Sequence, residues 1–210
     1  MTLKHELFSV SACLLLIVLY YLYLWRRTLR TPDSSAHSFN AKIRDRWVDM
    51  ILADKNNALL AIQTLRNSVM AANFMASTAI LLIIGTLSSS EKISHWLLQS
   101  GLQTLIPAYS IELSTLKLSL LILDFFIAFY CYSMAIRFFN HVGYMIGLAD
   151  SELTPQTSLY LNKAGLYYTL GTRSFFFSLP IILWLFGPCF LILGTLLLIL
   201  GLALLDHVSS

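Results

Sequence analysis

Four long apolar segments divide this chain, and each is long enough to cross a lipid bilayer as a helix. They cover residues 8–25, 58–87, 116–139 and 175–205. About 20 apolar residues in a helix cross the hydrocarbon core. In lipid the backbone polar groups must be satisfied within each segment, which a helix achieves. The sequence therefore predicts an all-α, polytopic membrane protein with four transmembrane helices.

The composition supports a membrane protein without a separate soluble domain. The 210 residues are 57% hydrophobic and only 12% charged, whereas soluble domains carry about 25% charged residues. The polar remainder consists of three connectors and two short tails. We therefore expect one membrane domain that covers residues 1–210.

Motifs of known catalytic or metal sites are missing from the sequence. Cys13, Cys131 and Cys189 each lie in an apolar segment without metal-ligand spacing, which favours buried structural thiols. The chain has no GxSxG, HExxH or glycine-rich phosphate motif, and its histidines are scattered. We expect no enzymatic activity, no catalytic residue, no metal, no cofactor and no nucleic-acid partner.

The distribution of basic residues predicts the orientation. Eleven Lys and Arg lie in or beside the connectors 26–57 and 140–174, against three on the other side. The positive-inside rule places both connectors in the cytoplasm and both termini outside. The basic cluster Arg26, Arg27 and Arg30 follows the first segment, so this segment is expected to remain as an uncleaved anchor. A re-entrant piece in the fourth segment is the less favoured alternative, and it would move the C-terminus.

Several connector features predict local structure. No Pro or Gly separates residues 40–57 from the second segment, which predicts one continuous helix from about residue 40 to 87. Residues 91–105 suggest a short helix on the outer leaflet. Thr154 and Pro155 predict a helix start with Thr154 as its cap. Pro180 and Gly187-Pro188 should kink the fourth transmembrane helix.

Polar side chains recur on one face of the second predicted transmembrane helix, residues 58–87. At 100° per residue they fall within an arc of about 120°. They are Gln63, Arg66, Asn67, Met70, Asn73 and Ser77. Such a stripe should turn away from lipid. It forms either a helix interface held by hydrogen bonds or the lining of a pore.

Asp124 is the acidic residue that lies deepest in the apolar segments. Its position in the third segment is about 20 Å from the level of Arg66, which excludes an ion pair between the two within one chain. Asp124 is then either protonated and hydrogen-bonded or exposed to water. We include it with the stripe among the candidate site residues.

A second candidate group should gather at the cytoplasmic ends of the helices. It consists of Arg66, Arg137, Asn140, His141 and Arg173. Such a basic layer serves either as an ordinary anchor to anionic lipid or as an anion site, in which Arg side chains bind oxyanions in pairs.

Particular strings in the chain resemble a known family. The strings RDRW at 44–47, QTLRNSVMAA at 63–72, RFFNHVGY at 137–144, GTRSFFF at 171–177 and WLFGP at 184–188 are similar to the bacterial and plant membrane family called domain of unknown function 599, or DUF599. We expect the protein to lie in the bacterial inner (plasma) membrane. The resemblance implies a four-span integral membrane protein. It implies no activity.

Two functions remain open at this point. The first is an oligomeric channel or carrier for a small ion or solute, in which copies of the chain place the polar stripe around an axis. The alternative is a structural or regulatory protein that binds partner proteins or anionic lipid. The expected partners are the lipid bilayer, further copies of the chain in a homo-oligomer, and anionic lipid.

Overall fold

A computed structural model describes the chain apart from residues 1, 31–35, 100–110, 149 and 207–210. Within the described residues every regular element is helical, which confirms the all-α class. The elements are α1 (Thr2–Arg30), α2 (Ala36–Ala53), the 3-10 turn η2 (Lys55–Asn57), α3 (Ala58–Gln99), α4 (Ile111–Leu148), the 3-10 turn η4 (Ser151–Leu153), α5 (Thr154–Trp184) and α6 (Pro188–Asp206).

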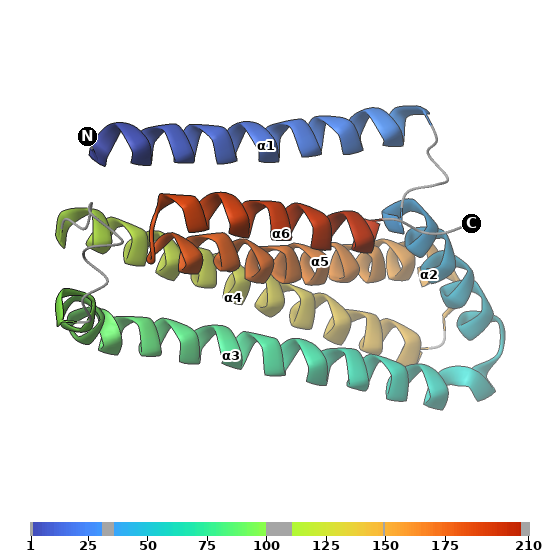
Figure 1. The fold of residues 1–210 in the computed structure, drawn as a ribbon. Coiled ribbons are helices and arrows are strands. Elements are labelled where there is room, and N and C mark those ends of the chain that lie inside the picture. Colours follow the sequence, from blue (N-terminus) through green and yellow to red (C-terminus); the bar gives the residue numbers. More distant parts are fainter. Residues whose placement is uncertain (1, 31–35, 100–110, 149, 207–210) are drawn as a thin grey trace.

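Helices α1, α3, α4, α5 and α6 lie side by side along one direction, and α2 crosses one end of the bundle (Figure 1). Helix α4 packs between α3 and α5, α6 packs on α5, and α1 packs on α6. Small residues allow α3 to approach α4 closely, since Ala72, Ala76 and Ala79 are buried against Ala128 and Tyr132. The core is therefore centred on α4.

In the part of the chain that the structure describes, three helices are long and apolar enough to cross a membrane, and they contain residues 4–27, 58–88 and 113–148. A shorter apolar helix covers Pro188–Leu204. Large apolar side chains such as Leu81, Phe126 and Leu204 are exposed on the outside of the bundle. Exposure of this kind is typical of lipid-facing helices, and it indicates a multi-pass membrane protein.

The prediction of one continuous helix over residues 40–87 is wrong. Helix α2 ends at Ala53, and α3 begins at Ala58. Asp54 explains the break, because its Oδ1 accepts a hydrogen bond from the backbone N–H of Asn56 at 3.0 Å and its carbonyl accepts one from Asn57 at 3.0 Å. An Asp that bonds to the following backbone in this way competes with the helix, and neither Pro nor Gly is needed.

The prediction of one kinked helix in the fourth segment is also wrong. Helix α5 passes through Pro180 and ends at Trp184, the chain reverses over residues 185–187, and α6 returns beside α5. Gly187 has φ 143°. A residue with a side chain would be strained in this conformation, whereas glycine adopts it readily. Pro188 then begins α6, where its missing N–H costs no hydrogen bond. Because of this reversal, α1 begins and α6 ends at opposite ends of the bundle (Figure 1).

The smaller predictions are resolved in part. Helix α5 begins at Thr154 as predicted, but Leu153 occupies the cap position. Cys13 and Cys131 are buried as expected, whereas Cys189 is exposed. The expected outer helix over 91–105 is a continuation of α3 as far as Gln99, and its remainder lies outside the described residues.

Candidate functional site

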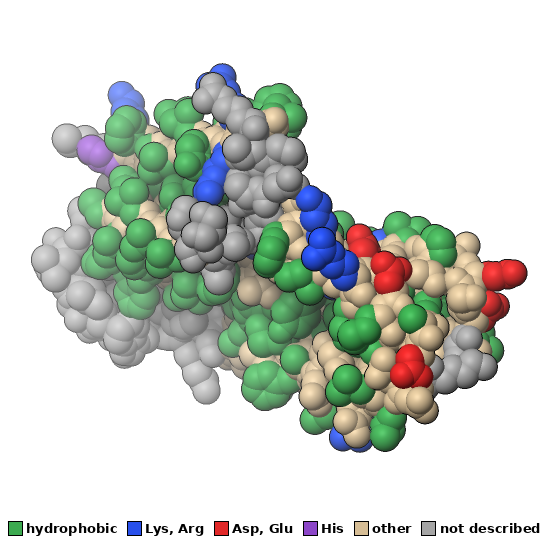
Figure 2. Space-filling model, turned by 90° about the vertical axis from the view of Figure 1, so that its right-hand side faces the viewer, with side chains coloured by type: hydrophobic (Ala, Val, Ile, Leu, Met, Phe, Trp, Pro, Cys, Tyr) green, Lys and Arg blue, Asp and Glu red, His purple; other side chains and the backbone are tan. Residues whose placement is uncertain are grey.

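A cavity of about 610 Å³ lies among α2, α3 and α5, near the end of the bundle that α2 crosses. Figure 2 looks onto this end, where Lys, Arg, Asp and Glu side chains gather. Helix α4 adds Phe139 to the cavity wall. The cavity is lined by Ile43, Arg44, Trp47, Thr64, Leu65, Asn67, Ser68, Ala71, Phe139, Leu161, Gly165, Tyr168 and Thr169. Cavities of about 300–1,000 Å³ with mostly apolar walls and a few polar groups are typical ligand sites.

Arg44 is the charged residue in this wall, and α5 holds it in place. Its Nε donates a hydrogen bond to Oδ1 of Asn162 at 2.8 Å. The Asn162 amide in turn donates to Oδ1 of Asp45 at 2.7 Å. Gly165 provides the space, because a Cβ at this position would lie 2.8 Å from Nη1 of Arg44. The guanidinium therefore lies directly on the α5 backbone.

The electrostatics of Arg44 suit an anion. Partial burial lowers the pKa of Arg44 from its ordinary value, and the neighbouring Asp45 carboxylate acts in the opposite direction. An arginine guanidinium nevertheless stays protonated in proteins. The cavity wall therefore carries a positive charge that is only partly solvated.

The Ser and Thr hydroxyl groups in the cavity wall donate to their own helices. Thr64 donates to the carbonyl of Leu60, Ser68 to that of Thr64, and Thr169 to that of Gly165, at 2.9, 3.2 and 2.8 Å. Their hydrogens are thus used within the helices. The other donor groups in the wall are the guanidinium of Arg44, the amide of Asn67, the indole N–H of Trp47 and the hydroxyl of Tyr168, a set that favours a ligand rich in acceptor oxygens.

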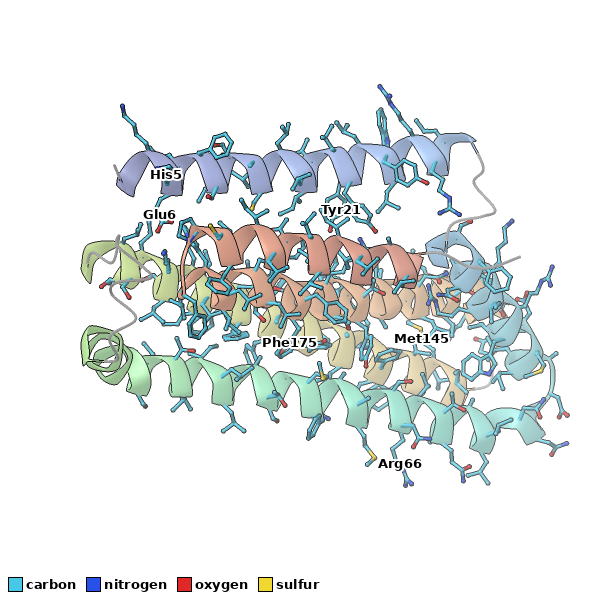
Figure 3. The ribbon with its side chains drawn as sticks, in the orientation of Figure 1. His5, Glu6, Tyr21, Arg66, Met145 and Phe175 are labelled. Carbon is cyan, nitrogen blue, oxygen red and sulfur yellow. The ribbon has the colours of Figure 1, made fainter. Side chains whose placement is uncertain are left out.

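The polar stripe lies on the outer face of α3 in the single chain. Gln63, Asn67, Asn73 and Ser77 are exposed, and Arg66 points away from the bundle (Figure 3). The stripe is centred about 150° around the helix from the alanines that pack on α4. It therefore forms no interface within the described part of the chain, although Asn67 at its edge also lines the cavity.

Asp124 does not join the stripe. It lies on α4, where its Oδ1 is 2.7 Å from Oγ of Ser174 on α5. The other carboxylate oxygen is buried and has no hydrogen-bond partner among the described residues.

The five residues of the expected basic layer are not gathered in one place. Arg137, Asn140 and His141 are exposed on α4, and the His141 ring contacts Tyr160 of α5. Arg66 lies on the outer face of α3. Arg173 is far along α5, next to Ser174, and thus at the level of Asp124. It lies farther from the start of α5 than expected, because α5 begins at Thr154, well before the predicted fourth span.

The comparisons with known proteins bear on this arrangement. The family described as "Protein of unknown function, DUF599" matches residues 8–210. The chain belongs to the DUF599 family. A search of curated proteins and a search of solved structures found no match for this DUF599 protein.

Sequence reasoning missed two cavity-lining residues of this DUF599 protein, Arg44 and Gly165, and the Asn162 side chain that orients Arg44. Arg44, Asn162 and Gly165 come together only because α2 folds back onto α5. In the sequence, Arg44 stands out only as part of a string shared with the family. On α5, Gly165 three residues after Asn162 is only a weak sequence signal of a binding site. Nothing in the sequence indicates that this helix contacts Arg44.

Proposed function

We propose that this DUF599 protein binds an anionic membrane lipid in the cavity among α2, α3 and α5. One observation supports the proposal most strongly: the guanidinium of Arg44, fixed by Asn162 against Gly165, lines a mostly apolar cavity. A partly buried arginine with a preset orientation recognises phosphate or carboxylate oxygens.

The position of the cavity suits the head of a lipid. Thr64 lies about 9 Å and Ala71 about 20 Å along α3 from its first residue, at 1.5 Å per residue. The basic end of a membrane protein faces the cytoplasm, so this part of α3 crosses the inner headgroup layer. The anionic head would contact Arg44 and Asn67, and the start of an acyl chain would lie against Ala71, Phe139 and Tyr168.

The experiment compares two arginines of the same helix. The full chain is purified in mild detergent, and binding of phosphatidylglycerol and phosphatidylcholine is measured by native mass spectrometry. We expect phosphatidylglycerol to bind preferentially, and Arg44→Gln to reduce its binding about tenfold or more, as loss of a charged hydrogen bond implies. Arg46→Gln removes the same charge from an exposed position and should leave binding nearly unchanged.

Two results would contradict lipid binding at this cavity. Equal loss of phosphatidylglycerol in both variants would mean that only total charge matters. Displacement of the lipid by millimolar inorganic phosphate, with phosphate retained, would identify a free anion instead of a lipid as the ligand.

A second candidate function is an oligomeric channel or carrier for a small ion or solute. The outer face of α3 favours it, because Asn67, Asn73 and Ser77 are exposed on a helix that is otherwise apolar. Exposure of these groups to acyl chains is costly. Copies of the chain around a symmetry axis would cover the stripe, since amides both donate and accept hydrogen bonds.

Oligomeric state and flux test this second candidate together. A channel predicts an oligomer in mild detergent that Asn73→Leu weakens, and ion or solute flux in liposomes that the same variant alters. The control is Leu81→Ala, at an exposed apolar position, which should change neither readout. Ala72→Leu would not serve as a control, because Ala72 is buried. A monomer, or liposomes without flux, would count against it.

We also propose five membrane crossings, by α1, α3, α4, α5 and α6. Helix α6 has 19 residues, about 28 Å at 1.5 Å per residue, which suits the hydrocarbon core. The reversal at Gly187 supports five crossings in place of the four that hydropathy favours. With the N-terminus outside, the end of α6 would then face the cytoplasm.

A further inference from the structure

Two carboxyl groups whose side chains the structure describes lie inside the bundle, and their surroundings differ sharply. Glu6 of α1 faces the bundle (Figure 3) and receives hydrogen bonds from Nζ of Lys117 at 3.2 Å and from Nε1 of Trp184 at 2.6 Å. Its negative charge therefore has a cation and a second donor. Among the described residues, Asp124 has neither.

The single hydroxyl of Ser174 lies within reach of two oxygens of Asp124. Its Oγ is 2.7 Å from the carboxyl Oδ1 and 3.0 Å from the backbone carbonyl oxygen. Both oxygens are acceptors when Asp124 is ionised, and a hydroxyl carries one hydrogen. If Asp124 is protonated, its own O–H donates to Ser174, and the Ser174 hydroxyl donates to the carbonyl. Protonation thus gives each short contact its own hydrogen.

The remaining oxygen, Oδ2, supports the same protonation state. It is buried and has no hydrogen-bond partner among the described residues. Leu121 and Phe125, close to Asp124 on α4, and Phe175, next to Ser174 on α5, form one apolar cluster with Ile83 of α3. A bare carboxylate oxygen in such surroundings is far more costly than the carbonyl oxygen of a neutral acid.

The charged and titratable groups nearby do not supply a counter-charge. Lys117 lies about 10 Å away along α4 and is held by Glu6. Arg137 lies about 20 Å away in the other direction. On α5, Arg173 is turned by about 100° from Ser174. Tyr132, two turns from Asp124, pairs with Thr172, and α3 presents Ile80 and Ile83 in this cluster.

We propose that Asp124 and Ser174 form a proton-binding site within the membrane, at the contact between α4 and α5. A metal cation is a poor alternative ligand, because Na⁺, Ca²⁺ and Mg²⁺ need several more oxygens than these two residues offer. Loss of the proton places an uncompensated charge between α4 and α5, which weakens their packing. The site therefore links proton occupancy to the contact between these helices.

The test uses dicyclohexylcarbodiimide, an apolar reagent for protonated carboxyl groups, on the full chain in lipid vesicles. The carboxyl oxygen adds to the central carbon of the reagent and its proton moves to a reagent nitrogen, so no atom leaves. Mass spectrometry of the digested protein locates the adduct. We expect an adduct on the peptide with Asp124, more of it as the pH is lowered, and its complete loss in Asp124→Asn.

Glu6 is the matched control, since it lies in the same membrane but pairs with Lys117. We expect no adduct on Glu6 in the native chain. In Lys117→Met the cation is removed, so Glu6 should become reactive while Asp124 remains labelled. Retained labelling of Asp124 shows that this variant keeps its fold.

Infrared spectroscopy gives an answer that does not depend on access of the reagent. A neutral carboxyl group has a C=O band that a carboxylate lacks, and Asp124→Asn should remove this band from the native spectrum. Absence of the band would overturn the proposal, as would labelling of Glu6 and Asp124 to the same extent in the native chain.

Discussion

At the scale of single residues, Glu6, Lys117 and Trp184 join three helices at one end of the bundle. Lys117 also donates to the carbonyl of Trp184 at 3.1 Å, and its Nζ lies 4.8 Å from the centre of the Trp184 ring. Both charged side chains are almost fully buried. Because Trp184 is the last residue of α5, the cluster ties α1 and α4 to the point where the chain reverses.

This cluster leads to a stability prediction. Glu6→Gln leaves Lys117 buried without a counter-charge and should destabilise the protein by about 3–5 kcal/mol. The double variant Glu6→Gln with Lys117→Met should recover most of this loss, because Gln still accepts the hydrogen bond of Trp184 and no charge remains. Thermal unfolding in detergent measures both. Equal destabilisation of the single and double variants would contradict the ion-pair explanation.

Asn162 and Gly165 yield a second prediction at this scale. Asn162→Ala removes the acceptor that orients Arg44, and Gly165→Val fills the space that the guanidinium occupies. Each should lower phosphatidylglycerol binding about 5- to 30-fold, as loss of about 1–2 kcal/mol implies. Native mass spectrometry measures the effect.

A glycine elsewhere supplies the control for Gly165→Val. A Cβ added at Gly143 of α4 would meet no atom within 4 Å, so Gly143→Val should leave lipid binding unchanged. If Gly165→Val also binds normally, the position of Arg44 is not important for the ligand.

At the scale of elements, the hairpin of α5 and α6 depends on two glycines with different tasks. Gly187 supplies the positive φ of the reversal. Gly194 supplies contact, because a Cβ there would lie 2.8 Å from Cα of Pro180 and 3.0 Å from Cδ1 of Leu183. Both helices are apolar, so the small residue at their contact brings the backbones together.

Substitution of Gly194 tests this contact. Gly194→Ala should push α6 away from α5 and destabilise the protein by about 1–3 kcal/mol, the usual cost of overpacking. Gly201→Ala in the same helix meets no atom within 4 Å and should be neutral or stabilising by up to about 1 kcal/mol. Unfolding in detergent compares the two, and equal effects would show that the backbones are not in close contact.

At the scale of the whole molecule, the proposed five crossings place the two termini on opposite sides of the membrane. A reporter enzyme that is active only in the cytoplasm, fused after Ser210, should therefore be active, and a reporter active only outside should be silent. Fusions at the N-terminus should give the reverse. Activity of the outside reporter at both ends would restore the four-crossing topology.

The first three spans were predictable because each is an unbroken apolar run with polar connectors. The division of the fourth apolar segment between α5 and α6 was not predictable, because hydropathy does not distinguish one bent helix from two helices that pack against each other. The break at Asp54 was missed for a related reason: the Asp-based turn uses a residue that is also acceptable in a helix. Of the predicted site residues, Asn67 alone lines the candidate cavity, and the contact of Arg44 with α5 was not visible in the sequence.

Apolar composition and segment length alone determined that this chain forms membrane helices, since lipid requires every backbone group to be satisfied locally. Only the tertiary structure decided which side chains meet. Arg44 and Asn162 are 118 residues apart, and Asp124 and Ser174 are 50 apart. Contacts at such separations depend on how helices pack and reverse, which periodicity within a single helix does not encode.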